Sequence, residues 1–156
     1  MVSSVLRSWI RDRWLRPLES APDPLQALQD LAEWGEGAVT ARGLALGCPL
    51  QRLVEELSGV DEGFRVRLAA IYEDWRRGLV SLLSAAQSRG QLRPEVDVEL
   101  ASTFIVAAWQ GSIGLAKAFQ DVETLRSCRL GLSAYLGTLR APAVPPPDVP
   151  GQDDGK

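Results

Sequence analysis

The sequence predicts an all-α fold, an antiparallel bundle of about six helices. Apolar residues recur three and four positions apart in every well-supported segment, and this spacing places them on one face of a helix. Residues that favour helix ends separate the segments. Asp23-Pro24, Asp61 and Asp97 suit helix starts, and Gly90 suits the position after a helix end. No stretch shows the strict apolar–polar alternation that is typical of a half-buried strand.

The N-terminal part is expected to hold two helices and an ambiguous segment. The first, residues 2–18, has Trp9 and Trp14 on its apolar side and arginines elsewhere, which indicate either a solvated face or a basic patch for an anionic partner. A second helix begins at Pro24, but Gly35 and Gly37 each weaken it by roughly 1 kcal/mol against alanine. Residues 34–47 are therefore either a frayed helix or a mobile loop.

Four further helices are expected. A short one spans residues 48–58, and a long one begins at Asp61 and reaches Arg89. Two more follow over residues 97–119 and 123–140. Residues 141–156 contain five prolines together with polar residues, so we expect a disordered tail after a helical domain of residues 1–140.

The segment 97–119 is apolar almost all round its expected helix. A bulky face is expected to fill the core: Phe104, Ile105, Ala108, Trp109, Leu115 and Phe119. A second face is lined by small residues: Ala107, Gly111, Gly114 and Ala118. A thin polar strip remains for water: Glu99, Thr103, Gln110 and Lys117. Because such a helix must be covered on nearly all sides, it predicts a second layer, either a neighbouring helix or a second copy of the chain.

Composition excludes several classes of function. The chain has 156 residues, enough for one domain, and its net charge of −3 argues against general nucleic-acid binding. We expect no membrane association and a cytoplasmic location, because no apolar run approaches the length of a membrane span and no signal peptide is visible. The chain has no histidine, and its two cysteines match no metal or redox spacing. We therefore expect no metal, no cofactor and no enzymatic activity.

Several stretches together resemble the C-terminal regulatory domain of TetR-family transcriptional repressors. They are WIRDRW at 9–14, DPL at 23–25, LGCPLQRLVEEL at 46–57, QSRGQLRP at 87–94, DVELA at 97–101, AAWQG at 107–111 and LAK at 115–117. The resemblance implies a helical bundle that binds a small effector in its interior and pairs its last two helices with those of a second copy. In that family a separate N-terminal head carries the helix-turn-helix that reads DNA. The chain begins where the family's fourth helix would, so we expect it to lack this head and not to bind DNA itself.

Two sets of candidate site residues follow. The small faces of the last two helices predict a homodimer contact at Ala107, Gly111, Gly114, Ala118, Gly131 and Ala134. These residues could instead let the two helices pack on each other within one chain. The expected inward faces predict an effector site at Trp34, Tyr72, Trp75, Phe104, Ala108 and Trp109. The ligand is expected to be small and largely apolar or aromatic, although plain core packing would explain the same residues.

The sequence therefore predicts the sensing and dimerisation domain of a TetR-like repressor. The alternative is a stand-alone helical module that binds no ligand and titrates a full-length regulator by forming heterodimers with it.

Overall fold

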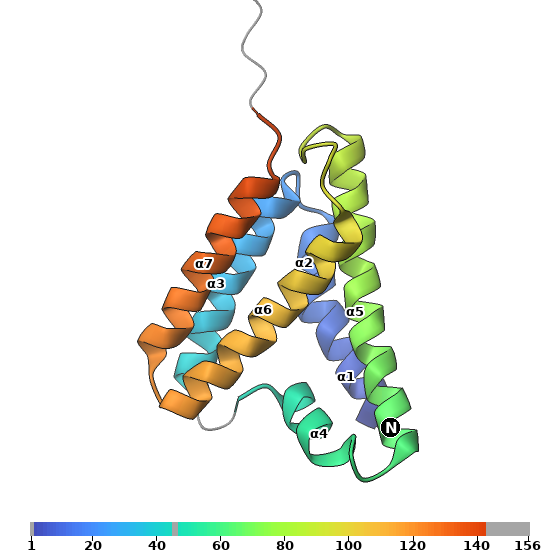
Figure 1. Cartoon of the computed structure of the whole chain (residues 1–156), viewed down its shortest axis with the longest axis vertical. Helices are drawn as coiled ribbons and strands as arrows, with labels where there is room; N and C mark the ends of the chain where they lie inside the picture. The colour runs from blue at the N-terminus through green and yellow to red at the C-terminus, as the bar shows by residue number, and fades with distance from the viewer. Residues whose placement is uncertain (1, 45–46, 143–156) are drawn as a thin grey trace, which may run out of the picture.

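The computed structural model describes residues 2–44 and 47–142. Its elements are α1 Val2–Ile10, η1 Arg11–Leu15, α2 Arg16–Glu19, α3 Pro24–Arg42, α4 Pro49–Leu57, α5 Glu62–Ser88, α6 Val98–Phe119 and α7 Val122–Leu139 (Figure 1). Within the described ranges there is no strand, only an isolated bridge between Leu92 and Arg140. The predicted all-α bundle is confirmed. Of the expected tail, residues 143–156 lie outside the described residues.

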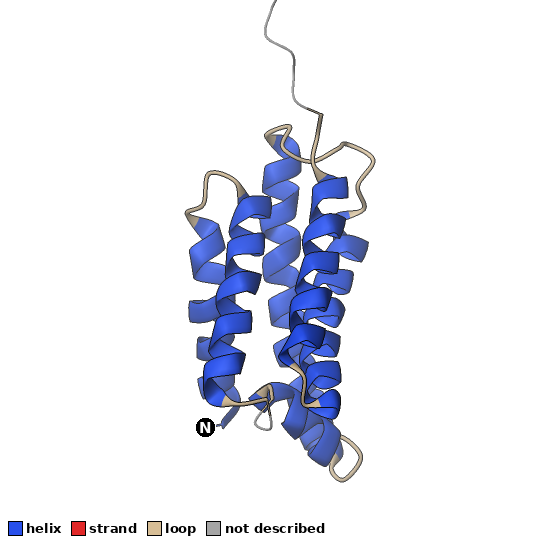
Figure 2. Cartoon of the chain, turned by 90° about the vertical axis from the view of Figure 1, so that its left-hand side faces the viewer, coloured by secondary structure: helices blue, strands red, loops and turns tan. Residues whose placement is uncertain are grey.

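The long helices alternate in direction along the chain, from α1 through α3, α5 and α6 to α7 (Figure 1). Their connecting loops gather at two ends of the bundle (Figure 2). The helix α6 packs between α5 and α7, and α3 packs against α7. One continuous core joins these helices and includes Leu18, Leu79, Leu83, Ala116 and Leu125, each nearly inaccessible to solvent.

Side-chain caps begin the helices where the sequence indicated. Asp23 accepts hydrogen bonds from the backbone N–H groups of Leu25 and Gln26, and Asp61 accepts one from Phe64. Asp97 caps α6 in the same way. Such caps satisfy backbone donors that have no partner inside the helix.

The first helical run contains a π-helical segment that the sequence analysis did not expect. The chain is helical without a break through α1, η1 and α2, and Pro17 lies just after η1. The backbone N–H of Arg16 donates to the carbonyl of Arg11, five residues earlier. Proline has no N–H to donate and its ring crowds the preceding turn, so a wider turn before Pro17 accommodates it.

The helix α3 continues through both glycines to Arg42, which excludes the loop interpretation of residues 34–42. Gly35 is needed for close packing, because a Cβ atom there would lie 2.4 Å from Cη2 of Trp109. The absent side chain at Gly35 thus makes room for a tryptophan from α6.

The expected division of α6 into two faces is partly wrong. Phe104, Leu115 and Phe119 do not fill the core, since 46%, 48% and 66% of their surfaces are exposed. Gln110, expected in the polar strip, is buried, and neither atom of its amide has a partner. The reason is angular: a five-residue separation turns Phe104 about 140° away from the buried Trp109.

Apolar residues on both sides of α6 also correct the expectation about membrane spans. Within the described residues, α6 is long and apolar enough to cross a membrane, with a mean hydropathy of 1.2. Of that apolar window, 44% is buried inside the bundle. The high hydropathy of α6 therefore comes from two sets of apolar residues, one in the core and one facing outward.

Candidate functional site

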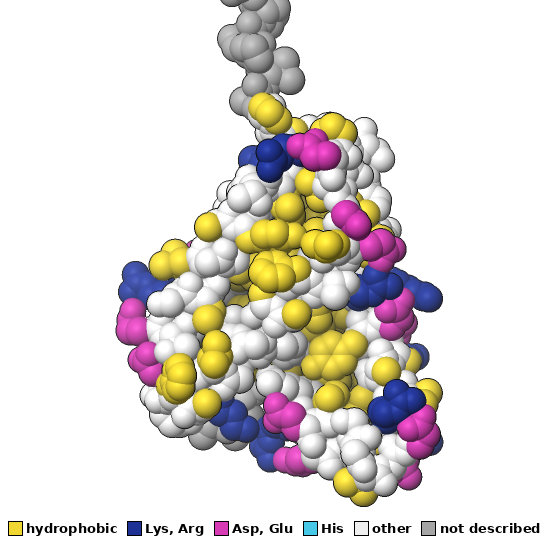
Figure 3. All heavy atoms as spheres, viewed as in Figure 1, with side chains coloured by type: hydrophobic (Ala, Val, Ile, Leu, Met, Phe, Trp, Pro, Cys, Tyr) yellow, Lys and Arg dark blue, Asp and Glu magenta, His cyan; other side chains and the backbone are white. Residues whose placement is uncertain are grey.

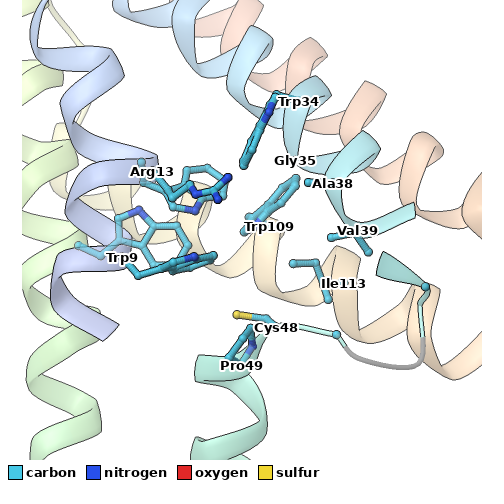
Figure 4. Close-up of a pocket in the computed structure, with 14 residues that line it drawn as sticks. Trp9, Arg13, Trp34, Gly35, Ala38, Val39, Cys48, Pro49, Trp109 and Ile113 are labelled. Carbon is cyan, nitrogen blue, oxygen red and sulfur yellow. The ribbon is translucent and has the colours of Figure 1, made fainter. Parts of the chain in front are cut away.

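All five tryptophans of the chain line one cavity of about 50 Å³ (Figure 4). They come from five elements of the fold: Trp9 from α1, Trp14 from η1, Trp34 from α3, Trp75 from α5 and Trp109 from α6. The remaining lining residues are Arg13, Gly35, Ala38, Val39, Gly43, Gly47, Cys48, Pro49 and Ile113. A cavity surrounded by so many rings is mainly apolar, as small-molecule sites usually are.

Trp14 lies at the centre of the inner wall. Its ring centroid is 4.9 Å from those of both Trp75 and Trp109, at interplanar angles of 53° and 64°. Tilted and edge-to-face arrangements of this kind are favourable for aromatic pairs. All three rings are buried, so they form a packed inner surface.

The outer rim is more accessible. Trp34 is 49% exposed, and the guanidinium of Arg13 lies 4.7 Å from the centroid of its ring. Figure 4 shows Arg13 and Trp34 close to each other on the side of the cavity opposite Cys48 and Pro49. Because few contacts hold an exposed side chain, this rim is the part of the wall that can move most easily.

Two polar groups of the lining have no acidic or acceptor partner. The indole Nε1–H of Trp75 is buried and has no acceptor in residues 2–44 and 47–142. An unsatisfied buried donor of this kind costs about 1–3 kcal/mol. Arg13 makes no ion pair within the described residues, whereas Arg7 and Arg16 pair with Asp74 and Asp12.

The structure brings together only half of the residues predicted for an effector site. Trp34, Trp75 and Trp109 line the cavity. Tyr72 lies behind the wall, stacked on Trp75 with ring centroids 6.4 Å apart, and burial raises the pKa of its hydroxyl.

The other two predicted residues are not in the lining. Ala108 is half-buried in the core. Phe104 lies on the surface, with its ring centroid 4.5 Å from that of Tyr135 on α7. The expectation that Phe104 faces the interior is therefore wrong.

Trp9, Arg13 and Trp14 are among the lining residues that were not predicted, because the first helix was interpreted as an apolar packing side with a solvated or basic face. Pro17 inside that helix was an available signal, since proline in a helix interior usually marks a local distortion. The π-helical segment just before it carries both Arg13 and Trp14.

A second candidate site is the outward face of α6 and α7. Five large apolar residues of these two helices are exposed: Leu100, Phe104, Leu115, Phe119 and Leu130. Figure 3 shows hydrophobic side chains over α6, with charged side chains mainly toward the edges of this view. Exposed apolar patches of this kind usually mark interaction sites.

Most of the small residues predicted for a dimer contact lie on this outward face. Five are exposed: Ala107, Gly111, Ala118, Gly131 and Ala134. A Cβ atom at Gly111 or Gly131 would meet nothing within 4 Å. Gly114 is half-buried, and a Cβ there would lie 3.0 Å from Nε2 of Gln51. Gly111 and Gly131 therefore do not serve to pack α6 against α7 within the chain.

Comparison with proteins of known sequence supports the family resemblance. The family described as "Tetracyclin repressor-like, C-terminal domain" matches residues 24–132. An HTH-type transcriptional regulator of Lactococcus lactis is 33% identical over 104 residues, which are 67% of this chain and 51% of that protein. The transcriptional regulator AcuR of Cereibacter sphaeroides is 27% identical over 110 residues, 70% of this chain and 50% of AcuR. The chain thus spans about half the length of these relatives.

Solved structures show the same fold. A TetR transcriptional regulator from Chloroflexus aurantiacus superposes with a TM-score of 0.77 at 22% identity, covering 90% of this chain and 71% of that one. A regulatory protein TetR from Rhodobacter sphaeroides gives a TM-score of 0.76 at 21% identity, covering 86% and 71%. This chain therefore belongs to the tetracyclin repressor-like C-terminal-domain family, a family of transcriptional regulators rather than enzymes.

Proposed function

We propose that this chain senses a small, largely apolar or aromatic molecule in the tryptophan cavity and dimerises through the outward face of α6 and α7. The convergence of all five tryptophans on one cavity carries the proposal. The tryptophans converge from five elements and leave an apolar space open between their rings, whereas a filled core would leave none. Membership of the family supports the proposal too, since TetR-family regulators are typically homodimers that bind small effectors.

The position of the cavity suggests how binding would be transmitted. Trp9, Arg13 and Trp14 belong to the first helical run, whereas Trp109 and Ile113 belong to α6. A ligand that separates these walls would shift the first run relative to α6. Since α6 also carries the outward face, the same movement would change the position of residues at the proposed dimer contact.

The role proposed here is regulation in the cytoplasm, without direct contact with DNA or a membrane. The net charge of −3 provides no excess of basic groups for binding phosphates. The apolar side of α6 that faces outward is assigned to a second protein chain instead.

A panel of small apolar and aromatic compounds tests the sensing role. We expect at least one compound to raise the melting temperature of the purified chain and to change its tryptophan fluorescence, because binding stabilises the folded state. Since every tryptophan lines the cavity, binding there should change the fluorescence directly. A broad panel in which no compound has either effect would show that the cavity is ordinary core packing.

Sedimentation equilibrium tests the assembly. A homodimer is expected at micromolar concentration. A monomer would contradict the homodimer and favour the alternative function, in which the outward face binds a different, full-length regulator.

A further inference from the structure

The polar side chains that line the tryptophan cavity are donors of hydrogen bonds. The indole Nε1–H of Trp75 has no acceptor among the described residues, and only 2% of the residue is exposed. The guanidinium of Arg13 carries a positive charge at the rim. No aspartate or glutamate is among the described residues that line the cavity.

Arg13 differs from its neighbours on the same helical run. Arg7 pairs with Asp74 at 3.1 Å, and Arg16 pairs with Asp12 at 3.3 Å. Over the described ranges Arg13 has no carboxylate within ion-pair distance, and its contact is with the ring of Trp34. Its charge is therefore available to a ligand, and the ring of Trp34 fixes where the guanidinium lies.

These observations point to one charge class. We propose that the effector is an organic anion, with an apolar body between the tryptophan rings and a carboxylate or similar acceptor bound by Arg13 and Trp75. This inference rests on the proposed sensing function and adds the chemistry of its ligand. Arginine recognises carboxylates well because its planar guanidinium offers two parallel donors.

A cationic effector is the competing possibility, since aromatic cages bind quaternary ammonium groups. Here the cage already contains Arg13, whose guanidinium lies over Trp34. A bound cation would meet this like charge, and the described part of the lining has no carboxylate to offset it.

The size of the cavity guides the choice of probes. Its volume of about 50 Å³ suits a short-chain acid. A ring-sized acid would enter only if the half-exposed Trp34 moved outward. Propanoate and benzoate cover the two cases, and their amides propanamide and benzamide have nearly the same shape without the charge. Benzyltrimethylammonium serves as the cation.

Isothermal titration calorimetry on the full chain, with tryptophan fluorescence as a second readout, tests the proposal. At least one of the two acids is expected to bind about tenfold or more tightly than its amide, because a hydrogen bond to a charged group is stronger than a neutral one. The Arg13→Gln variant should lose this preference, and Arg13→Lys should keep part of it. Trp75→Phe should weaken the binding of acid and amide alike, since both offer an acceptor to the indole.

Arg11→Gln is the matched control. Arg11 lies in the same π-helical segment, is exposed, and does not line the cavity. Its substitution changes the net charge as Arg13→Gln does, so it should leave the preference for the acid intact.

Four outcomes would overturn the proposal. Equal affinity of acid and amide, or tighter binding of benzyltrimethylammonium, would contradict an anionic effector but leave a sensing site in place. If a neutral apolar compound bound and neither acid did, an anionic effector would again be contradicted and the sensing site would remain. If neither these probes nor the panel bound, the sensing function would fall together with its charge preference.

Discussion

Gly35 and Gly37 lie two positions apart in α3, but they meet different surroundings. A Cβ atom at Gly35 would lie 2.4 Å from the ring of Trp109, whereas one at Gly37 would meet nothing within 4 Å. Both residues are within the helix, where alanine is intrinsically favoured over glycine by about 1 kcal/mol. The two positions therefore separate helix propensity from packing.

We expect Gly37→Ala to raise the free energy of unfolding by about 1 kcal/mol through helix propensity. Gly35→Ala should instead lower it by about 1 kcal/mol or more, because overpacking against the buried Trp109 outweighs the same gain. Urea denaturation of the two variants measures both changes. If Gly35→Ala were as stabilising as Gly37→Ala, the close packing of Trp109 on α3 would be wrong.

Asp23 combines a helix cap with an ion pair. Its carboxylate accepts from two backbone N–H groups at the start of α3 and from Arg140, at 2.6 Å, near the end of α7. Burial by itself would raise the pKa of Asp23, but the bonds from Arg140 and the backbone outweigh burial and hold the pKa below its ordinary 3.8. The folded state therefore binds this proton less tightly than the unfolded chain does.

Asp23 should consequently stabilise the fold fully above pH 3.8, and this stabilisation should disappear as the pH falls through the lower folded pKa. Asp23→Asn keeps a capping side chain but loses the charge, at a cost of about 0.2–1 kcal/mol at neutral pH. We expect the difference between wild type and variant, measured by urea denaturation, to shrink below about pH 4.

Arg140→Gln provides the control for Asp23, because it removes the partner charge and leaves the cap. In that background the pH-dependent cost of Asp23→Asn should be smaller, because only the backbone N–H groups still favour the charged carboxylate. An unchanged effect would mean that the ion pair does not contribute to the pH dependence.

At the scale of whole elements, periodicity predicted each helix well but not the side on which α6 is covered. Spacing of three and four residues together with aspartate caps located α3, α5, α6 and α7 within a few positions. It could not settle α6, because apolar residues occur all round that helix. Which of them are buried depends on where α5 and α7 pack, and that is a tertiary property.

The cavity was predictable only in part for a similar reason. Trp75 and Trp109 lie on regular apolar faces, so periodicity identified them as inward-facing. Periodicity also placed Trp14 on the apolar side of the first helix, but it did not indicate that Arg13 would lie beside the cavity, because both residues are in a π-helical turn. Half of the predicted effector residues therefore line the cavity, and the first helical run supplied three of the lining residues that were not predicted.

The π-helical segment packs closely on α5. A Cβ atom at Gly78 would lie 2.5 Å from Cδ1 of Leu15, the last residue of η1. We expect Gly78→Val to lower the free energy of unfolding by about 1–3 kcal/mol through overpacking. Its tryptophan emission should also shift to the red, since separating η1 from α5 would expose Trp14 and Trp75.

Leu15→Ala in the same chain distinguishes this contact from a general effect of valine in a helix. If Leu15 is the obstacle, the double variant should be more stable than the sum of the two single changes predicts. Additive losses would show that Gly78 and Leu15 do not touch in solution.

For the molecule as a whole, the outward face of α6 and α7 is the proposed contact between two copies of the chain. Gly111 lies in the middle of this face, exposed and with open space around it in the protomer, and Gly37 is equally open on α3. An arginine at either position can extend into solvent in a single protomer. In the proposed homodimer, only the arginine at Gly111 would be forced into the contact between two copies.

We therefore expect Gly111→Arg to convert the homodimer to monomer and Gly37→Arg to leave the dimer intact, as measured by sedimentation equilibrium. Burying an unpaired charge at a closely packed contact is strongly unfavourable, so the dissociation constant should rise by about a hundredfold or more. The helical content of both variants, followed by circular dichroism, should match that of the wild type. A Gly111→Arg chain that remained dimeric would place the contact elsewhere, and the exposed residues of α6 would then need a different partner.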